Sequence, residues 1–159
     1  MAESLHAKMT ALLGHTTQDT RGRKVELYHR LLDQLVPDEA RILGLLSDGS
    51  AVALVNVYDR TKTRVPVVKN ATLLAGAAEL ALPQQAPHYV ERLRSLGLVV
   101  IGREDSALSV KYDMLLAEPR VAAAVHAAAW GPVPAKVELR SLRLSELGIA
   151  LWENASGPN

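Results

Sequence analysis

Three short segments rich in valine and leucine interrupt a chain whose other apolar residues recur at helical spacing. Residues 51–59, 98–101 and 137–144 have the β-branched or alternating pattern that predicts strands. Helices are predicted over residues 1–13, 24–36, 37–47, 71–80, 87–96, 110–116, 119–130 and 146–152. So few strands among so many helices predict a mainly α fold with a small antiparallel sheet (α+β).

The order of these elements predicts the architecture. From Pro37 onward it is helix, strand, helix, helix, strand, insertion, strand and helix. A tight pair of helices between the first two of three strands is typical of a winged helix-turn-helix-like domain. We therefore expect such a domain over residues 37–155, with a helical insertion at about 106–134 in place of the wing. Residues 1–36 are a predicted N-terminal helical arm, and its polar segment 15–23 is a predicted flexible linker.

Residues that favour helix ends indicate where the predicted helices begin and end. Asn70 is the predicted N-cap of the helix over residues 71–80, because its side chain accepts a hydrogen bond from a first-turn amide. Pro87 suits the first turn of the next helix, and Gly97 suits its C-terminal end. Ser145 is the predicted N-cap of the last helix.

Composition places the chain among folded globular proteins. It has 159 residues, the size of one domain plus an arm. Hydrophobic residues make up 48% and charged residues 22% of the chain. The absence of cysteine excludes disulfide frameworks, zinc–thiolate sites and cysteine nucleophiles. A net charge of +1 gives no overall attraction to DNA or to an anionic membrane.

No segment of the sequence has the length and hydropathy of a membrane span or of a secretion signal. Residues 1–13 are amphipathic and carry the polar side chains Glu3, His6 and Lys8. The uncharged run at residues 121–134 is too short and too weakly apolar to cross a bilayer. We therefore expect a cytoplasmic protein with no membrane partner.

The helix over residues 87–96 is the predicted recognition helix, with Val90, Leu93 and Leu96 toward the core. Double-stranded DNA is therefore a predicted partner. Glutamine pairs with adenine and arginine with guanine, while further basic side chains contact phosphates. The predicted DNA-contact residues are Gln84, Gln85, His88, Arg92, Arg60, Lys62, Arg64, Arg140 and Arg143.

The charge distribution leaves a second interpretation open. Residues 71–105 carry slightly more acidic than basic side chains, and Glu91 on the recognition helix would repel phosphates. A fold that binds DNA in some proteins serves protein contacts in others. The alternative function is a protein–protein interaction or dimerisation module with no nucleic-acid binding.

The two helices of the arm predict an assembly surface. Residues 1–13 and 24–36 each carry a broad apolar face, which either folds back on the domain or packs on a partner. A homodimer through these N-terminal helices is therefore predicted.

Motifs that carry catalysis are absent from the sequence. It has no phosphate-binding glycine loop, dinucleotide fingerprint, nucleophile elbow or zinc-protease motif. Metal-ligand spacing is also lacking among the five histidines, which are His6, His15, His29, His88 and His126. We expect a non-enzymatic protein with no catalytic residue, metal or cofactor.

Five segments together carry a family resemblance. They are PDEARILGLLSDG (37–49), NATL (70–73), LPQQAPHYVERLRSLGLV (82–99), YDMLLAEPRV (112–121) and LRLSELGIALW (142–152). Through them the chain resembles, over roughly residues 37–152, the Abi-alpha family of bacterial proteins, named for abortive infection, a phage-defence response. The resemblance implies the fold and a role in phage defence or regulation. It transfers no catalytic residues, and members of the family carry a longer region before the domain.

Overall fold

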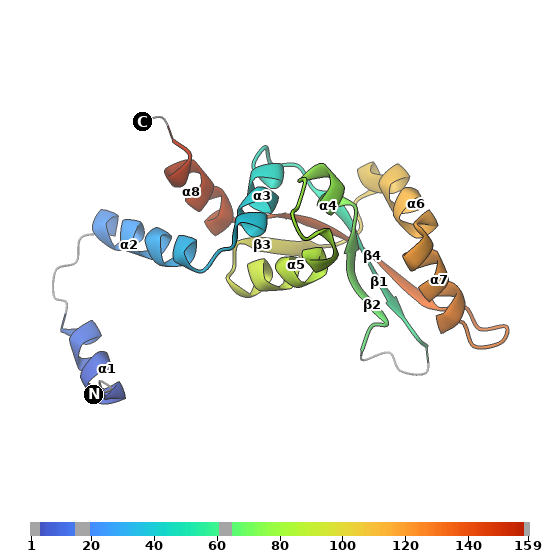
Figure 1. Cartoon of the computed structure of the whole chain (residues 1–159), viewed down its shortest axis with the longest axis horizontal. Coiled ribbons are helices and arrows are strands. Elements are labelled where there is room, and N and C mark those ends of the chain that lie inside the picture. The colour runs from blue at the N-terminus through green and yellow to red at the C-terminus, as the bar shows by residue number, and fades with distance from the viewer. Residues whose placement is uncertain (1–3, 15–19, 61–64, 158–159) are drawn as a thin grey trace. The chain divides into compact units, whose positions relative to one another are not determined.

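The computed structural model describes residues 4–14, 20–60 and 65–157. The chain divides into two compact units, Met1–Gln34 and Leu35–Asn159 (Figure 1). The division falls close to the expected end of the arm at residue 36. Each unit is described by itself below.

The first unit holds helices α1 (Leu5–Leu13) and α2 (Thr20–Asp33). Ser4 caps α1 by accepting a hydrogen bond from the amide of Ala7 at 3.0 Å. The predicted linker is wrong for residues 20–23, which are helical, whereas residues 15–19 lie outside the described part of the chain. Glu26 explains the longer helix, because it pairs with Arg23 at 3.0 Å and with Arg30 at 3.6 Å along one side of α2.

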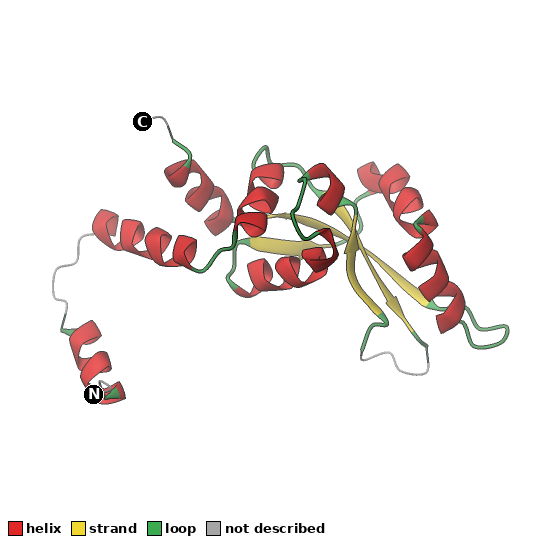
Figure 2. Ribbon diagram, viewed as in Figure 1, coloured by secondary structure: helices red, strands yellow, loops and turns green. Residues whose placement is uncertain are grey.

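The second unit is mainly helical with a small antiparallel sheet, which confirms the predicted fold class (Figure 2). Its elements in chain order are α3 (Pro37–Leu46), β1 (Val52–Tyr58), β2 (Val68–Thr72), α4 (Leu74–Ala77), η1 (Pro83–Gln85), α5 (Ala86–Ser95), β3 (Val99–Gly102), η2 (Ser106–Leu108), α6 (Ser109–Ala117), α7 (Pro119–Ala128), β4 (Lys136–Leu144) and α8 (Glu146–Ala155).

The described strands form one four-stranded antiparallel sheet in the order β2-β1-β4-β3. The pairing of β1 with β4 runs without interruption from Val52 opposite Leu142 to Tyr58 opposite Lys136. The predicted strands β1, β3 and β4 are confirmed. The winged-helix interpretation of their order stays a prediction.

Strand β2 was not predicted from the sequence, and the assignment of Asn70 as a helix N-cap is wrong. Asn70 lies within β2, and α4 is a single turn that begins four residues later. Ala71 and Thr72 pair with β1, and the register shifts between Val55 and Val57. This irregularity leaves Asn70 at a φ of 58°, a conformation that asparagine tolerates better than most residues. Residues 70–72 therefore belong to strand β2, where the sequence predicted the start of a helix.

The two faces of the sheet are covered by different helices. Successive strand residues point to opposite faces, so Ala53, Val55 and Val57 share one face of β1. Helices α6 and α7 contact β1 on that face and close an apolar cluster. Its buried members are Ala53, Val55, Val57, Tyr112, Leu115, Val121, Ala128 and Ala135. The predicted insertion is therefore helical, and it packs on the sheet.

The other face of the sheet carries α3, α5 and α8. Helix α5 contacts β2 and β3, whereas α3 and α8 contact β4. Ser145 is the N-cap of α8, as predicted, and its hydroxyl oxygen accepts a hydrogen bond from the backbone amide of Gly148 at 2.9 Å. Gly148 has no room for a side chain, because a Cβ there would lie 2.1 Å from the carbonyl oxygen of Leu98. This close approach fixes α8 against the start of β3.

Candidate functional site

Helix α5 is the element on which the sequence analysis placed recognition. Tyr89, Val90 and Leu93 form its buried side, so the predicted inward positions of Val90 and Leu93 are confirmed. Gly97 follows the helix at a φ of 76°, which glycine adopts without strain and which turns the chain into β3. The outer side of α5 borders a groove over the sheet.

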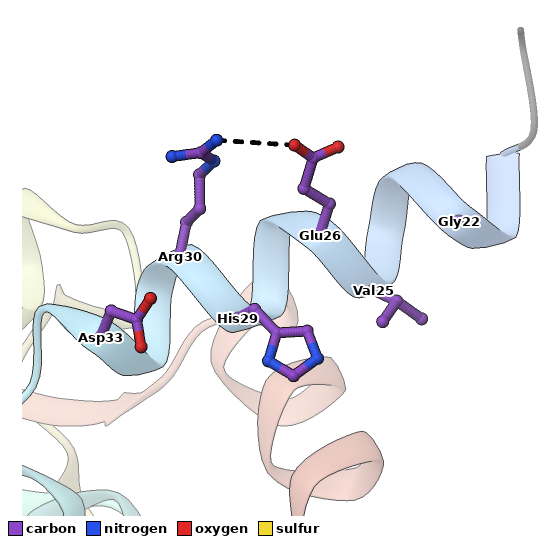
Figure 3. A pocket seen from close by; sticks show the side chains of 6 residues that line it. All are labelled: Gly22, Val25, Glu26, His29, Arg30 and Asp33. Carbon is purple, nitrogen blue, oxygen red and sulfur yellow. Dashed lines mark ion pairs between the residues drawn. The ribbon is translucent and has the colours of Figure 1, made fainter.

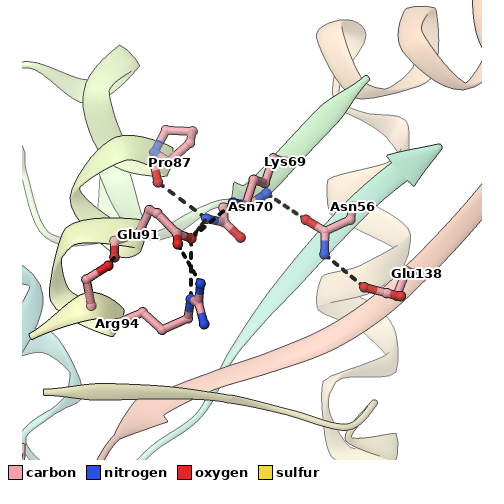
Figure 4. Close-up of polar contacts among 8 residues, drawn as sticks. Asn56, Lys69, Asn70, Pro87, Glu91, Arg94 and Glu138 are labelled. Carbon is pink, nitrogen blue, oxygen red and sulfur yellow. Dashed lines mark hydrogen bonds and ion pairs between the residues drawn. The ribbon is translucent and has the colours of Figure 1, made fainter. Parts of the chain in front are cut away.

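This groove, called the α5 groove below, has a volume of about 540 Å³. It lies between α5, β2 and the polar half of the β1–β4 pair (Figure 4). Its polar lining residues are Asn56, Lys69, Asn70, Glu91, Arg94, Glu138 and Arg140. They come from four different elements, so only the folded chain brings them together.

Two asparagines connect the sheet to α5. The Asn56 side chain donates to Glu138 at 3.0 Å, and its oxygen accepts the backbone amide of Asn70 at 2.8 Å. The Asn70 side-chain amide lies 3.4 Å from the carbonyl oxygen of Pro87 and 3.5 Å from Glu91 (Figure 4). Both asparagines are buried. Hydrogen bonds therefore satisfy their polar groups and hold the floor of the groove in one arrangement.

Glu91 is the charge centre at the α5 side of the groove. Its carboxylate lies 2.6 Å from Arg94 and 3.3 Å from Lys69. The hydrogen bond from Arg94, together with Lys69, lowers the pKa of Glu91 to about 2 against the opposing effect of burial. Glu91 is therefore a carboxylate at neutral pH, with two cations bound to it.

Glu138 has the same character at the sheet side. Arg140 lies 3.1 Å from its carboxylate, and hydrogen bonds from Arg140 and Asn56 lower the pKa of Glu138. The same pair raises the pKa of Arg140. The groove thus holds two permanently charged acids, each matched by cations. A general acid or base needs a pKa near the working pH, which neither carboxylate has.

The structure gives partners to the predicted DNA-contact arginines that it describes. The pairs are Arg60 Nε with Pro134 O at 2.8 Å, Arg92 with Glu39 at 3.5 Å, Arg140 with Glu138 at 3.1 Å, and Arg143 with Asp105 at 4.0 Å. Arg92 has a particular constraint, because the Glu39 side chain that it faces is fully buried. If Arg92 turned away to contact a DNA phosphate, the buried Glu39 carboxylate would lose its paired cation.

The remaining predicted contact residues divide into two groups. Gln84, Gln85 and His88 are exposed at the start of α5, where a ligand can reach them. Lys62 and Arg64 lie outside the described residues. The nine predicted residues therefore do not form one described surface, and only Arg140 lines the α5 groove.

Sequence reasoning did not select Asn56, Arg94 and Glu138 as site residues. Asn56 carried a usable signal, because it is a lone amide in the apolar segment VALVNVY. A buried polar side chain in a strand needs a partner, and that need points to a polar network. Glu138 gave no such signal, since its position opposite Asn56 follows from the strand register.

A second pocket, of about 480 Å³, runs along α2 in the first unit (Figure 3). Its lining residues are Gly22, Val25, Glu26, His29, Arg30 and Asp33. All of them belong to one helix, and Glu26 and Arg30 project from a different side of it than Val25 and His29 (Figure 3). Because its side chains do not converge, the α5 groove remains the better candidate site.

The part of the chain that the structure describes contains no group of three or more histidine, aspartate or glutamate side chains placed to hold a metal ion. No described helix combines the length and the hydropathy that a membrane span requires.

The fold and the groove define an α+β protein with a polar candidate site. The family model for abortive infection alpha matches residues 1–155, and the chain belongs to this family. The match extends the resemblance, which covered roughly residues 37–152, through the N-terminal helices. A similar solved structure is that of an uncharacterized protein from the hydrocarbon-degrading marine bacterium Alcanivorax borkumensis SK2. It is 26% identical, with a TM-score of 0.65, over 88% of this chain and 99% of that one. No curated protein matches the sequence.

Proposed function

We propose that this chain is a non-enzymatic binding protein of the abortive-infection response, and that it binds a protein partner and not DNA. The observation that carries the proposal is the pairing of the described arginines in the predicted DNA-contact set. This is the alternative that the charge distribution of the sequence left open. The α5 groove is one proposed contact with a partner, and the N-terminal helices are a separate one.

DNA binding draws much of its free energy from counterion release. DNA affinity grows with each phosphate that a lysine or arginine neutralises, because condensed cations then leave the DNA. An arginine already held by a carboxylate must give up that pair first. Arg92 would uncover the buried Glu39, and Arg140 would leave Glu138 without its cation. A groove of matched charges supports specific polar contacts with another protein, where complementary charges set the orientation.

A DNA titration tests this proposal. The full chain is titrated with a labelled random duplex at 50 and 200 mM salt, and binding is followed by fluorescence anisotropy. We expect no binding in the micromolar range and no dependence on salt. Affinity that falls steeply with salt, and falls further in Arg140→Ala, contradicts the proposal. Lys111→Ala, which removes an exposed cation of α6, is the matched control.

A second candidate, sequence-specific DNA binding, is supported by the exposure of Gln84, Gln85 and His88 at the start of α5. Glutamine reads adenine through paired hydrogen bonds that need no net charge. In this case a selected duplex binds and Gln85→Ala weakens it, while the slope with salt stays unchanged. The same titration, repeated with the selected duplex in place of the random one, separates the two functions, since the protein-binding proposal expects neither effect.

The N-terminal helix α1 supports the partner-binding part of the proposal. None of its described residues is buried, and Leu5, Met9, Leu12 and Leu13 are all more than half exposed. Such a helix gains stability when its apolar side is covered. A second copy of the chain is one partner that would cover it, as the sequence predicted.

Light scattering of the full chain tests the homodimer. If α1 forms the contact, the double variant Leu5→Glu, Met9→Glu has a lower mass than the unchanged chain at the same concentration. The control is Lys8→Glu, which adds negative charge to the same helix outside its apolar residues. Equal masses for all three chains overturn the arm-mediated dimer.

A further inference from the structure

The turn after α7 presents an unusually exposed tryptophan. Trp130 has 66% of its surface exposed, and Val133 has 40%. Two backbone hydrogen bonds between these residues, of 2.8 and 2.9 Å, close the turn. Gly131, at a φ of 56°, provides the tight bend. This segment, residues 130–133, is called the Trp130 turn. The hydrogen-bonded turn holds the indole ring exposed to solvent, and exposed aromatic side chains of this kind often anchor protein interfaces.

A second groove of the same unit has complementary chemistry. It has a volume of about 660 Å³ and lies beside the edge strand β2. Its lining combines small and apolar residues, among them Val68, Ala71, Leu73, Gly76 and Val121, with the polar side chains of Lys69, Thr72, Gln84, Glu118 and Arg120. A Cβ added at Gly76 would meet no atom within 4 Å, so there is open space at this wall. The groove, called the β2 groove, is large enough to hold an indole ring.

The Trp130 turn and the β2 groove lie at opposite ends of one helix. Val121, near the start of α7, lines the groove, and the turn begins two residues after α7 ends at Ala128 (Figure 1). The seven helical steps from Val121 to Ala128 rise roughly 10 Å at 1.5 Å per residue, and two further residues lead to Trp130. An antiparallel pair of α7 helices sets the turn end of each helix beside the groove end of the other.

We infer that a second copy of this chain binds here, with Trp130 of each copy in the β2 groove of the other. A two-fold axis across the middle of α7 makes both contacts at once, which is the self-complementary arrangement of a closed dimer. The exposed residues of α7 between the two features are Ala122, Ala123, His126 and Ala127. Three of these four are alanines, which permit close approach of the two helices.

This inference concerns a different surface from the partner contacts proposed above. Its tests are made in the Leu5→Glu, Met9→Glu background, because a dimer through α1 would otherwise keep the mass of Trp130→Ala unchanged. The first test is light scattering of the full chain over a concentration series. We expect a dimer whose dissociation constant rises at least about 100-fold in Trp130→Ala, because two buried indoles are lost per dimer. Ile149→Ala is the matched control, since Ile149 is another exposed apolar residue, on α8. A mass unchanged by Trp130→Ala overturns the inference.

The second test follows Trp130 directly. In a Trp152→Phe background Trp130 is the remaining tryptophan, so its emission reports its own environment. We expect the emission to move to shorter wavelength as the concentration rises, and Gly76→Arg to abolish this shift by filling the groove. A shift that persists in Gly76→Arg, or no shift at dimer concentrations, overturns the inference.

Mixing two variants gives a third, independent result. Trp130→Ala keeps an open groove, and Gly76→Arg keeps the indole, so a heterodimer of the two has one intact contact. We expect the mixture to associate more strongly than either variant alone. If mixing has no effect, the turn and the groove do not bind each other.

Discussion

The two faces of the β1–β4 pair differ in what covers them. On one face, α6 and α7 close over Ala53, Val55 and Val57, and the polar group of Tyr112 is fully used. Its hydroxyl donates to Arg140 O at 2.7 Å and accepts the Asp105 amide at 3.1 Å. On the other face, the same strands present Asn56 and Glu138 to an open groove.

The difference shows how one strand serves two purposes. Because side chains alternate, β1 packs a dry core with one set of residues and holds a charged network with the next. The dry face stabilises the sheet through burial of apolar area. The groove face holds its polar groups in fixed positions. Removing these groups from water costs free energy, but fixed polar groups favour specific contacts with a partner. The charged network is thus separated from the dry face by a single layer of backbone, while apolar residues such as Leu54 are buried beside it on its own face.

The strongest test of this separation is a cavity on the dry face. Leu115→Ala removes a side chain that is 1% exposed, and we expect a loss of about 2–5 kcal/mol in the free energy of unfolding. Met114→Ala, at its 50% exposed neighbour, should change it by no more than about 0.5 kcal/mol. Urea denaturation measures both variants. A loss for Leu115→Ala as small as that of the control would contradict a packed core between α6, α7 and the sheet.

A smaller effect is expected from the groove face. Asn56→Ala leaves the Asn70 amide without its acceptor and Glu138 without one donor, which should cost about 1–3 kcal/mol. Asn56→Asp restores the acceptor but sets a second carboxylate beside Glu138. We therefore expect Asn56→Asp to be less stable than the unchanged chain at pH 7 and to recover as acid neutralises the pair. Equal losses for the two variants at every pH would sink the assigned hydrogen bonds.

The smallest expected effect is the pH dependence of the Glu91 ion pairs. The pKa of Glu91 falls from 4.5 to about 2 in the folded chain. Because the folded-state pKa is the lower one, the pairs stabilise the fold above about pH 4.5, and this contribution is lost as the pH falls through about 2. Glu91→Gln should therefore cost roughly 1 kcal/mol at pH 7 and almost nothing at pH 2.

Chemical denaturation at several pH values measures this difference. Glu104→Gln, in an exposed turn, controls for the loss of one negative charge. If Glu91→Gln has the same cost at pH 2 as at pH 7, the stabilisation does not come from the charged carboxylate.

Much of the fold could be predicted because its signals are local. Ser145 bonds an amide three residues away, and Pro37 and Pro87 begin helices by fixing their own backbone angles. The strand Val52–Tyr58 follows from its own β-branched residues. Local signals did not predict strand β2. The sequence around Asn70 favours a helix cap locally, and only the pairing of β2 with β1 overrides that preference.

The candidate site could not be predicted in the same way. Asn56 and Glu138 are 82 residues apart, and Asn70 and Glu91 are 21 residues apart. The arginines selected for DNA were sound choices by residue type. The carboxylates that pair with Arg92 and Arg143 come from distant parts of the chain, whereas Glu138 lies two residues from Arg140 on the same strand. Whether a charge is available to a ligand is a property of what lies within a few ångströms of it.

The sequence by itself determined the strands β1, β3 and β4, most of the helices, where several of them end, and the α+β class. It did so because hydrophobic period and end-capping act within a few residues. The tertiary structure alone decided that β2 completes the sheet, that the insertion seals one face, and that Glu39 and Asp105 pair with Arg92 and Arg143. Those outcomes depend on contacts between residues far apart in the chain, whose closeness arises only when the sheet forms.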